Sequence, residues 1–139
     1  MRNSKPVLLV EDDNVDVMTF KRAFADLKVR NPLVCTENGK EAVEYLKNKT
    51  NKKPCLIVLD LNMPKMNGFE FLDVVKEDED LKQIPVVVLT TSCEQKDRIR
   101  TFKSRAVGHI VKPTNYTEFL EAVNTINQYW TLSELSNVY

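Results

Sequence analysis

The chain of 139 residues contains little cysteine, glycine or histidine, and it has no excess of charge of either sign. Its three cysteines are far apart and show no Cys-x-x-Cys or Cys/His spacing, which argues against a metal or redox site built on thiolates. Its three glycines show neither Gly-x-Gly-x-x-Gly nor Walker spacing, so a glycine-rich nucleotide loop is not expected. Basic and acidic residues balance at 20 each and no DNA-binding motif occurs, so we expect no nucleic-acid partner.

Long hydrophobic runs are also missing. The longest, Cys55–Leu59 and Val86–Leu89, have the length of strands and are far too short to cross a membrane. The first residues lead directly into a short apolar strand, without the core or cleavage site of a signal peptide. We therefore expect a cytoplasmic protein with no membrane partner. A hydrophobic fraction of 42% and a charged fraction of 29% are typical of one soluble globular domain.

Short apolar, β-branched runs alternate with segments of helical periodicity along the chain. The runs are Val7–Val10, Leu33–Thr36, Cys55–Asp60, Ile84–Thr90 and His109–Lys112. The helical segments are 17–27, about 39–48, about 67–79, about 95–106 and 119–130. Strict alternation of strands and helices predicts an α/β fold, with a doubly wound five-stranded parallel sheet and helices on both of its faces.

Polar residues stand where four of the predicted strands end, and that edge is where such a sheet gathers ligands. They are Glu11, Asp12 and Asp13 after the first strand, Asp60 at the third, Thr90 at the fourth and Lys112 at the fifth. An Asp that closes an apolar strand, as Asp60 does, is half buried and uncompensated unless another group pairs with it. Crowded carboxylates raise each other's pKa, and a hard dication with oxygen ligands relieves that repulsion. This donor set favours Mg²⁺ over an all-protein Ca²⁺ cage.

Some of these residues also have a purely structural interpretation. Asp13 stands where a helix N-cap is expected, and we favour that role for it. Lys112 fits either an ordinary ion pair or the point charge that holds a phosphoryl oxygen. A strand-end threonine such as Thr90 is a common β-former, and its hydroxyl is also able to donate to the same oxygen.

In their order along the chain, these motifs resemble the receiver domain of two-component response regulators, and are similar to the single-domain chemotaxis receivers. The resemblance covers about residues 6–130 and rests on Leu8–Asp13, Ile57–Pro64, Lys65–Gly68, Val86–Thr91 and Val111–Pro113. It implies the flavodoxin-like (βα)5 fold with strand order 2-1-3-4-5. It also implies one receiver domain over residues 1–130, an apolar C-terminal tail over 131–139 and no output domain.

The resemblance implies a role for each residue at the strand ends. Asp60 would accept a phosphoryl group from a sensor histidine kinase, while Lys112 and the Thr90 hydroxyl would stabilise the phosphoryl oxygens. The implied Mg²⁺ ligands are Glu11 (mainly through water), Asp12, Asp60 and the backbone carbonyl of Asn62. The chain would catalyse only its own phosphorylation and dephosphorylation. It would signal through a changed protein-binding or dimerisation face.

Two positions depart from the usual receiver pattern. Thr91 follows the switch hydroxyl where receivers usually have a small residue, so we hypothesise altered dephosphorylation. Asn62 and Ser92 flank the same access path, and we expect them to tune the same rate. His109 stands where receivers commonly have Tyr or Phe. It is either an inward-turning switch residue coupled to Thr90 or a surface or packing residue of its strand.

The tail over residues 131–139 is unusually apolar for a chain end. It either folds back onto the domain or joins a homodimer contact, which resembles some phytochrome-partnered single-domain receivers. Asp80–Pro85 and Thr90-Thr91-Ser92 also resemble that subgroup, so a phytochrome is a candidate kinase partner, while the downstream protein stays unknown. The alternative function is a phosphorylation-independent interaction module on the same fold. A missing acceptor or lysine would indicate that module, and Asp60 and Lys112 are both present.

Overall fold

The computed structural model describes residues 5–61, 66–91 and 94–138, with side chains through residue 128. Its strands are β1 (Val7–Val10), β2 (Leu33–Thr36), β3 (Leu56–Leu59), β4 (Val86–Thr90) and β5 (Gly108–Val111). Its helices are α1 (Asn14–Asp26), α2 (Gly39–Lys47), α3 (Gly68–Glu77), α4 (Gln95–Lys103) and α5 (Tyr116–Val138). The predicted elements are confirmed, with bounds that differ by a few residues except at the end of α5. None of the described helices combines the length and apolar character needed to span a bilayer.

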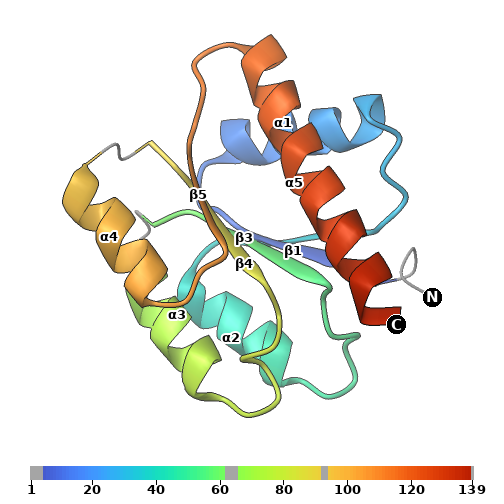
Figure 1. Ribbon diagram of the computed structural model, residues 1–139. Coiled ribbons are helices and arrows are strands. Elements are labelled where there is room, and N and C mark those ends of the chain that lie inside the picture. The colour runs from blue at the N-terminus through green and yellow to red at the C-terminus, as the bar shows by residue number, and fades with distance from the viewer. Residues whose placement is uncertain (1–4, 62–65, 92–93, 139) are drawn as a thin grey trace.

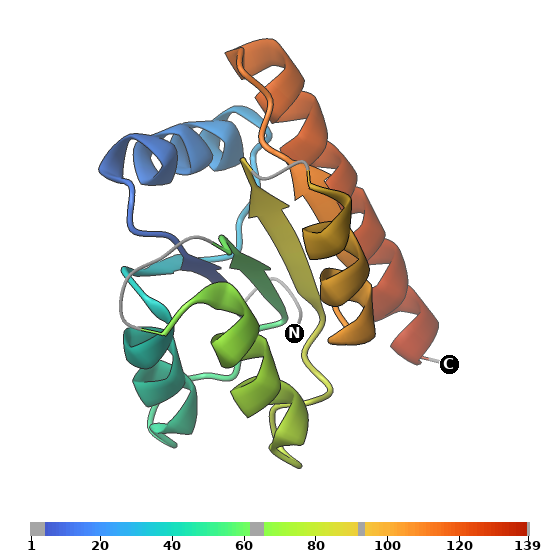
Figure 2. The ribbon, with the colours of Figure 1, turned by 90° about the vertical axis from the view of Figure 1, so that its left-hand side faces the viewer.

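The strands form one parallel sheet in the order β2-β1-β3-β4-β5, which confirms the predicted topology. Helices α1 and α5 cover one face of this sheet, and α2, α3 and α4 cover the other (Figure 1). The view turned by 90° shows the same layers from the side (Figure 2). Two layers of helices leave no open face on the central strands, and this is why β1, β3 and β4 are buried along their whole length.

Alternate side chains of each strand enter two separate hydrophobic clusters. On the α2 and α3 side, Leu8, Ile57 and Val88 pack against residues such as Phe71. On the α1 and α5 side, the intervening strand residues pack against Phe20, Phe24, Phe119, Val123 and Ile126. The rings of Phe20 and Phe119 meet edge to face at 6.0 Å, which fixes α1 against α5.

Helix α1 starts directly after the first strand end. The side chain of Asp13 accepts hydrogen bonds from the backbone N–H of Val15 at 2.8 Å and of Asp16 at 3.3 Å. The predicted N-cap role of Asp13 is therefore confirmed. At the other end of the chain, α5 continues to Val138, so the helix expected over 119–130 extends through most of the predicted tail.

Helix α3 approaches the backbone that follows β3 very closely. A Cβ atom on Gly68 would lie 2.7 Å from the Cα atom of Leu61 and 2.9 Å from the carbonyl oxygen of Asp60. The N–H of Gly68 also donates to the carbonyl oxygen of Leu61 at 3.1 Å. The first turn of α3 therefore fixes the backbone on the carboxyl side of Asp60.

We predict that Gly68→Ala lowers the free energy of unfolding by about 1–3 kcal/mol, because the new methyl group collides with backbone atoms that cannot rotate away. Gly108→Ala is the matched control, since its Cβ would meet only the Val87 side chain, with Cγ1 at an ordinary 3.6 Å and Cγ2 at 3.8 Å. That variant should change stability by less than about 1 kcal/mol. Urea unfolding of both variants measures the difference, and equal losses would contradict the close approach of α3.

Candidate functional site

The predicted polar residues meet at one edge of the sheet. Glu11 and Asp12 follow β1, Asp60 follows β3, Thr90 ends β4, and Lys112 follows β5. Backbone hydrogen bonds continue the strand pairing to this edge, from the Asp60 N–H to the Val10 carbonyl at 3.0 Å and from the Lys112 N–H to the Thr90 carbonyl at 2.7 Å. The side chains are therefore placed by the sheet itself.

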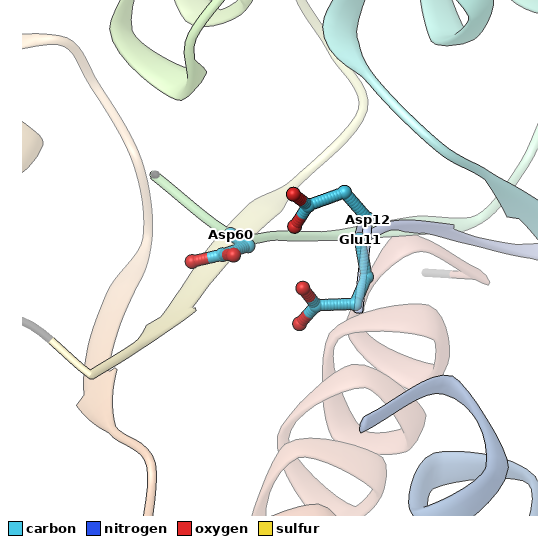
Figure 3. A group of neighbouring side chains, drawn as sticks. All are labelled: Glu11, Asp12 and Asp60. Carbon is cyan, nitrogen blue, oxygen red and sulfur yellow. The ribbon is translucent and has the colours of Figure 1, made fainter. Parts of the chain in front are cut away.

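Three carboxylates form the centre of the site. One oxygen atom from each of Glu11, Asp12 and Asp60 lies within 4.8 Å of the other two. Figure 3 shows Glu11 and Asp12 extending from the end of β1 toward the side on which Asp60 lies. Glu11 and Asp60 are buried, while Asp12 is exposed, so the cluster opens toward solvent on one side. A set of hard oxygen donors of this kind fits a divalent cation such as Mg²⁺.

Lys112 supplies the positive charge at this edge. Its Nζ atom lies 2.5 Å from Glu11 Oε1, 2.7 Å from Asp16 Oδ2 and 3.8 Å from Asp60 Oδ2. The side chain of Lys112 is only 8% exposed, so these ion pairs are largely shielded from water. The contacts of Lys112 with the strand-end carboxylates were expected from the sequence, but the contact with Asp16 was missed. No local pattern identifies Asp16, because it lies in the first turn of α1 and meets Lys112 only through tertiary packing.

Burial and neighbouring charges alter the ionisation of Glu11 and Lys112. Burial raises the pKa of Glu11 from 4.5 to about 8, the charge of Asp60 adds to the rise, and the hydrogen bond and charge of Lys112 oppose it. Burial lowers the pKa of Lys112, but the hydrogen bonds to Asp16 and Glu11 and the charge of Asp60 outweigh it. The net pKa of Lys112 is raised, which keeps the lysine cationic.

The switch candidates lie along β4 and β5. Thr90 is fully buried and Thr91 is exposed. His109 is half-buried and its Nδ1 atom lies 3.0 Å from the hydroxyl oxygen of Thr101 on α4. That hydroxyl donates to the Asp97 carbonyl at 2.7 Å, so the His109 Nδ1–H is the donor to Thr101. The imidazole therefore lies against α4 in this structure.

Asn62 and Ser92, which were expected to line the access path, lie outside the described residues. The same holds for the proposed carbonyl ligand of Asn62. Among the described residues, Glu11, Asp12 and Asp60 form the acidic group, and Lys112 and Thr90 stand at the same edge.

Sequence comparison places the chain among characterised regulators. The family profile described as "Response regulator receiver domain" matches residues 7–124. The chain is 35% identical over 127 residues to the probable methanogenesis regulatory protein FilR2 of Methanothrix harundinacea (strain 6Ac), covering 89% of this chain and 82% of that protein. It is 33% identical over 130 residues to the response regulator Rcp1 of a Synechocystis species, covering 91% of this chain and 88% of that protein.

Solved structures agree with these sequence matches. The phosphorylated cyanobacterial phytochrome response regulator RcpA superposes with a TM-score of 0.86 at 35% identity, covering 92% of this chain and 94% of that one. The Mn²⁺-bound form of Rcp1 superposes with a TM-score of 0.84 at 33% identity, covering 91% and 94% of the two chains. A cation-bound relative is consistent with the acidic group that Glu11, Asp12 and Asp60 form here.

We predict that divalent-cation binding strengthens as the pH rises toward 8. With its pKa raised to about 8, Glu11 holds a proton below that pH in the metal-free protein, and a cation beside it favours the ionised form. Binding then releases a proton, so the affinity for Mg²⁺ or Mn²⁺ should rise by up to about tenfold per pH unit and level off above pH 8. Calorimetric titration in two buffers of different ionisation enthalpy measures the released proton.

Glu11→Gln is the variant that isolates this effect. It removes the titrating proton, so the affinity should vary little between pH 6 and pH 8. A pH dependence of equal slope in Glu11→Gln and the unmodified protein would contradict the assignment to Glu11.

Proposed function

The chain belongs to the response regulator receiver domain family, and from this premise we propose that it is a phosphorylation switch whose acceptor is Asp60. The observation that carries the proposal is the gathering of Asp60, two further carboxylates and Lys112 at one edge of the sheet. The family is not one of classical enzymes, and we propose that the chain catalyses only its own phosphorylation and dephosphorylation.

In the proposed reaction, an oxygen of the Asp60 carboxylate forms a bond to phosphorus while the bond from phosphorus to the donor imidazole nitrogen breaks. The imidazole leaves with the electron pair, and Asp60 becomes an aspartyl phosphate. Lys112 and the Thr90 hydroxyl hold the phosphoryl oxygens. The work of these residues is therefore positioning and charge neutralisation, which dominate catalysis of phosphoryl transfer.

The proposed cofactor is Mg²⁺, held by Asp12, Asp60 and the Asn62 carbonyl, with Glu11 acting mainly through water. The closeness of the three carboxylates supports this assignment, because two buried acids and one exposed acid leave an uncompensated negative charge beside a single lysine. When bound, the ion supplies positive charge that offsets the charge of the entering phosphoryl group.

The proposed phosphodonor is a sensor histidine kinase in the cytoplasm. The relative RcpA is described as a phytochrome response regulator, which supports a phytochrome as the sensor for this chain.

Val15 and Met18 on α1 are 70% and 69% exposed although they are apolar. They lie in the first two turns of the helix that follows the site, so we propose that the kinase docks there.

The proposed output surface lies on α4 and β5. Phosphorylation adds nearly two negative charges beside Lys112 and Thr90, at the ends of β4 and β5. The His109–Thr101 hydrogen bond connects β5 to α4 and supports a switch role for His109. Apolar side chains are exposed around this connection, namely Ile99, Phe102, Val107 and Val111. We propose that the downstream protein recognises this surface. We also propose that Thr91, which directly follows β4, tunes dephosphorylation.

The alternative of a phosphorylation-independent interaction module requires a defective site. The acceptor carboxylate and the lysine are both present and lie 3.8 Å apart at Oδ2 and Nζ. This proximity favours the phosphorylation switch over the alternative.

We predict that incubation with Mg²⁺ and acetyl phosphate adds about 80 Da, the mass of one phosphoryl group, and that Asp60→Asn abolishes the addition. Intact-mass spectrometry measures both. Asp13→Asn is the matched control, because it makes the same change at a capping position where asparagine is also favourable, and it should be modified like the unmodified protein. Absence of the added mass in the unmodified protein would favour the interaction module.

If Thr91 tunes dephosphorylation, the added mass should decay at a different rate in Thr91→Ala.

We predict that the residues after 130 contribute to a homodimer. Analytical ultracentrifugation should give a larger sedimenting mass for the full chain than for a 1–130 truncation at the same concentration. The truncation lacks the apolar tail, which forms the end of α5. Circular dichroism of the truncation controls for folding. Equal masses for the two proteins would remove the tail from the dimer hypothesis.

A further inference from the structure

Asp16 makes a contact with Lys112 that the proposed function does not use. Its Oδ2 atom lies 2.7 Å from Lys112 Nζ, a charge-assisted hydrogen bond at the shorter end of the normal range. The acidic group formed by Glu11, Asp12 and Asp60 does not include Asp16, so its partner is the lysine and not the proposed cation.

The fold holds Asp16 in this position. Asp16 stands in the first turn of α1, and its backbone N–H donates to the Asp13 side chain, which caps the helix. The side chain of Asp16 is 33% exposed, whereas Lys112 is 8% exposed. Asp16 therefore reaches inward from the helix end and meets an ammonium that is almost completely enclosed.

A purely local role for Asp16 would be to place negative charge at the N-terminus of α1. That effect stabilises a helix by about 0.3–1 kcal/mol and needs no partner side chain. Glu118 occupies the corresponding first turn of α5 and is exposed. The difference between the two is the ion pair with Lys112, whose sequence position is 96 residues away from Asp16.

The geometry of the Lys112 ammonium determines what its contact with Asp16 does. An ammonium has three N–H donors in tetrahedral arrangement. Glu11 accepts one at 2.5 Å and Asp16 accepts another at 2.7 Å, so the side chain is held at two points. The Asp60 oxygen lies at 3.8 Å, beyond hydrogen-bond length, on the side where the phosphoryl group would be added.

We propose that Asp16 is a positioning residue for phosphoryl transfer, which together with Glu11 orients the Lys112 ammonium so that its third N–H is directed to the oxygen of a phosphoryl group on Asp60. The inference rests on the proposed function. Without Asp16, one of the two anchors is lost and the flexible lysine side chain spreads over other orientations. Misplacing a catalytic charge by about 1 Å slows a reaction by up to about 100-fold, so we expect the loss of this anchor to slow phosphoryl transfer by about 10- to 100-fold.

The kinetic test uses Asp16→Asn, Asp16→Glu and Glu118→Gln in the full chain with Mg²⁺ and acetyl phosphate. In this reaction the Asp60 oxygen bonds to phosphorus, and the bond from phosphorus to the acetyl oxygen breaks to release acetate. Asp16→Asn should lower the rate at saturating acetyl phosphate by about 10- to 100-fold while Mg²⁺ affinity changes by less than about threefold, because Asp16 contacts the lysine and not the cation site. Asp16→Glu keeps the carboxylate and should recover part of the rate. Glu118→Gln should match the unmodified protein.

The second measurement requires neither Mg²⁺ nor a phosphodonor. The ¹H–¹⁵N resonance of the Lys112 ammonium, assigned with Lys112→Arg, should be protected from exchange with water in the metal-free protein because its donors are held. Asp16→Asn should lose that protection and Glu118→Gln should retain it. A structural role at the helix end would move the unfolding midpoint but would leave the lysine resonance unchanged.

The outcomes separate the two proposals. If the unmodified protein accepts no phosphoryl group, the proposed function fails and the positioning role falls with it. If the unmodified protein is phosphorylated but Asp16→Asn has the same rate and the same lysine resonance, only the positioning role is overturned. A slowed reaction with an unchanged lysine resonance also overturns it, because Asp16 would then act by another route.

Discussion

The burial of like charges at the ends of β1 and β3 is the constraint on which the rest of the site depends. Glu11 and Asp60 are both buried, and Asp12 brings a third carboxylate oxygen within 4.8 Å of theirs. Removing a charge from water costs several kcal/mol unless another charge or hydrogen bond compensates it. The ion pair with Lys112 offsets part of this cost. The pKa of Glu11 is still raised, which means that its ionised form remains unfavourable. A divalent cation would offset the repulsion that remains, so the proposed cation binding and the cost of the buried charges in the metal-free protein have one origin.

The fold maintains this unfavourable arrangement by fixing the backbone around it. Strands that are apolar throughout carry Asp60 to the sheet edge, where two helices approach Leu61 and Met66 closely. A Cβ atom on Gly68 would lie 2.7 Å from the Leu61 Cα atom, and one on Gly39 would lie 2.7 Å from the Met66 carbonyl oxygen. The absence of a side chain at these two glycines therefore allows both contacts. The Asp60 backbone is held by packing, and Lys112 offsets part of the charge of its side chain.

Much of this arrangement could be predicted from the sequence, because it depends on local patterns. The apolar strands, the strand-end positions of Asp60 and Lys112 and the Asp13 cap all follow from residue order. The ion pair of Asp16 with Lys112 could not be predicted, since it depends on the rotation of α1 relative to β5, which tertiary packing sets. The inward position of His109 against Thr101 has the same cause. The full length of α5 was missed, although the apolar residues after 130 keep the helical spacing i, i+3, i+7.

Lys112 is connected to both helical layers of the molecule, and this matters for how a charge on Asp60 would be transmitted. Its backbone N–H donates to the Thr90 carbonyl, which connects it to β4 and, through β5, to the His109–Thr101 contact with α4. Its side chain reaches Asp16 and therefore α1, on the opposite face of the sheet. A phosphoryl oxygen on Asp60 that accepts the third N–H of this ammonium would be joined through it to Asp16, and therefore to α1. The contact that completes the site thus involves α1, where the kinase is proposed to dock. Coupling of the docking face to phosphorylation requires no element beyond the lysine and its two anchors.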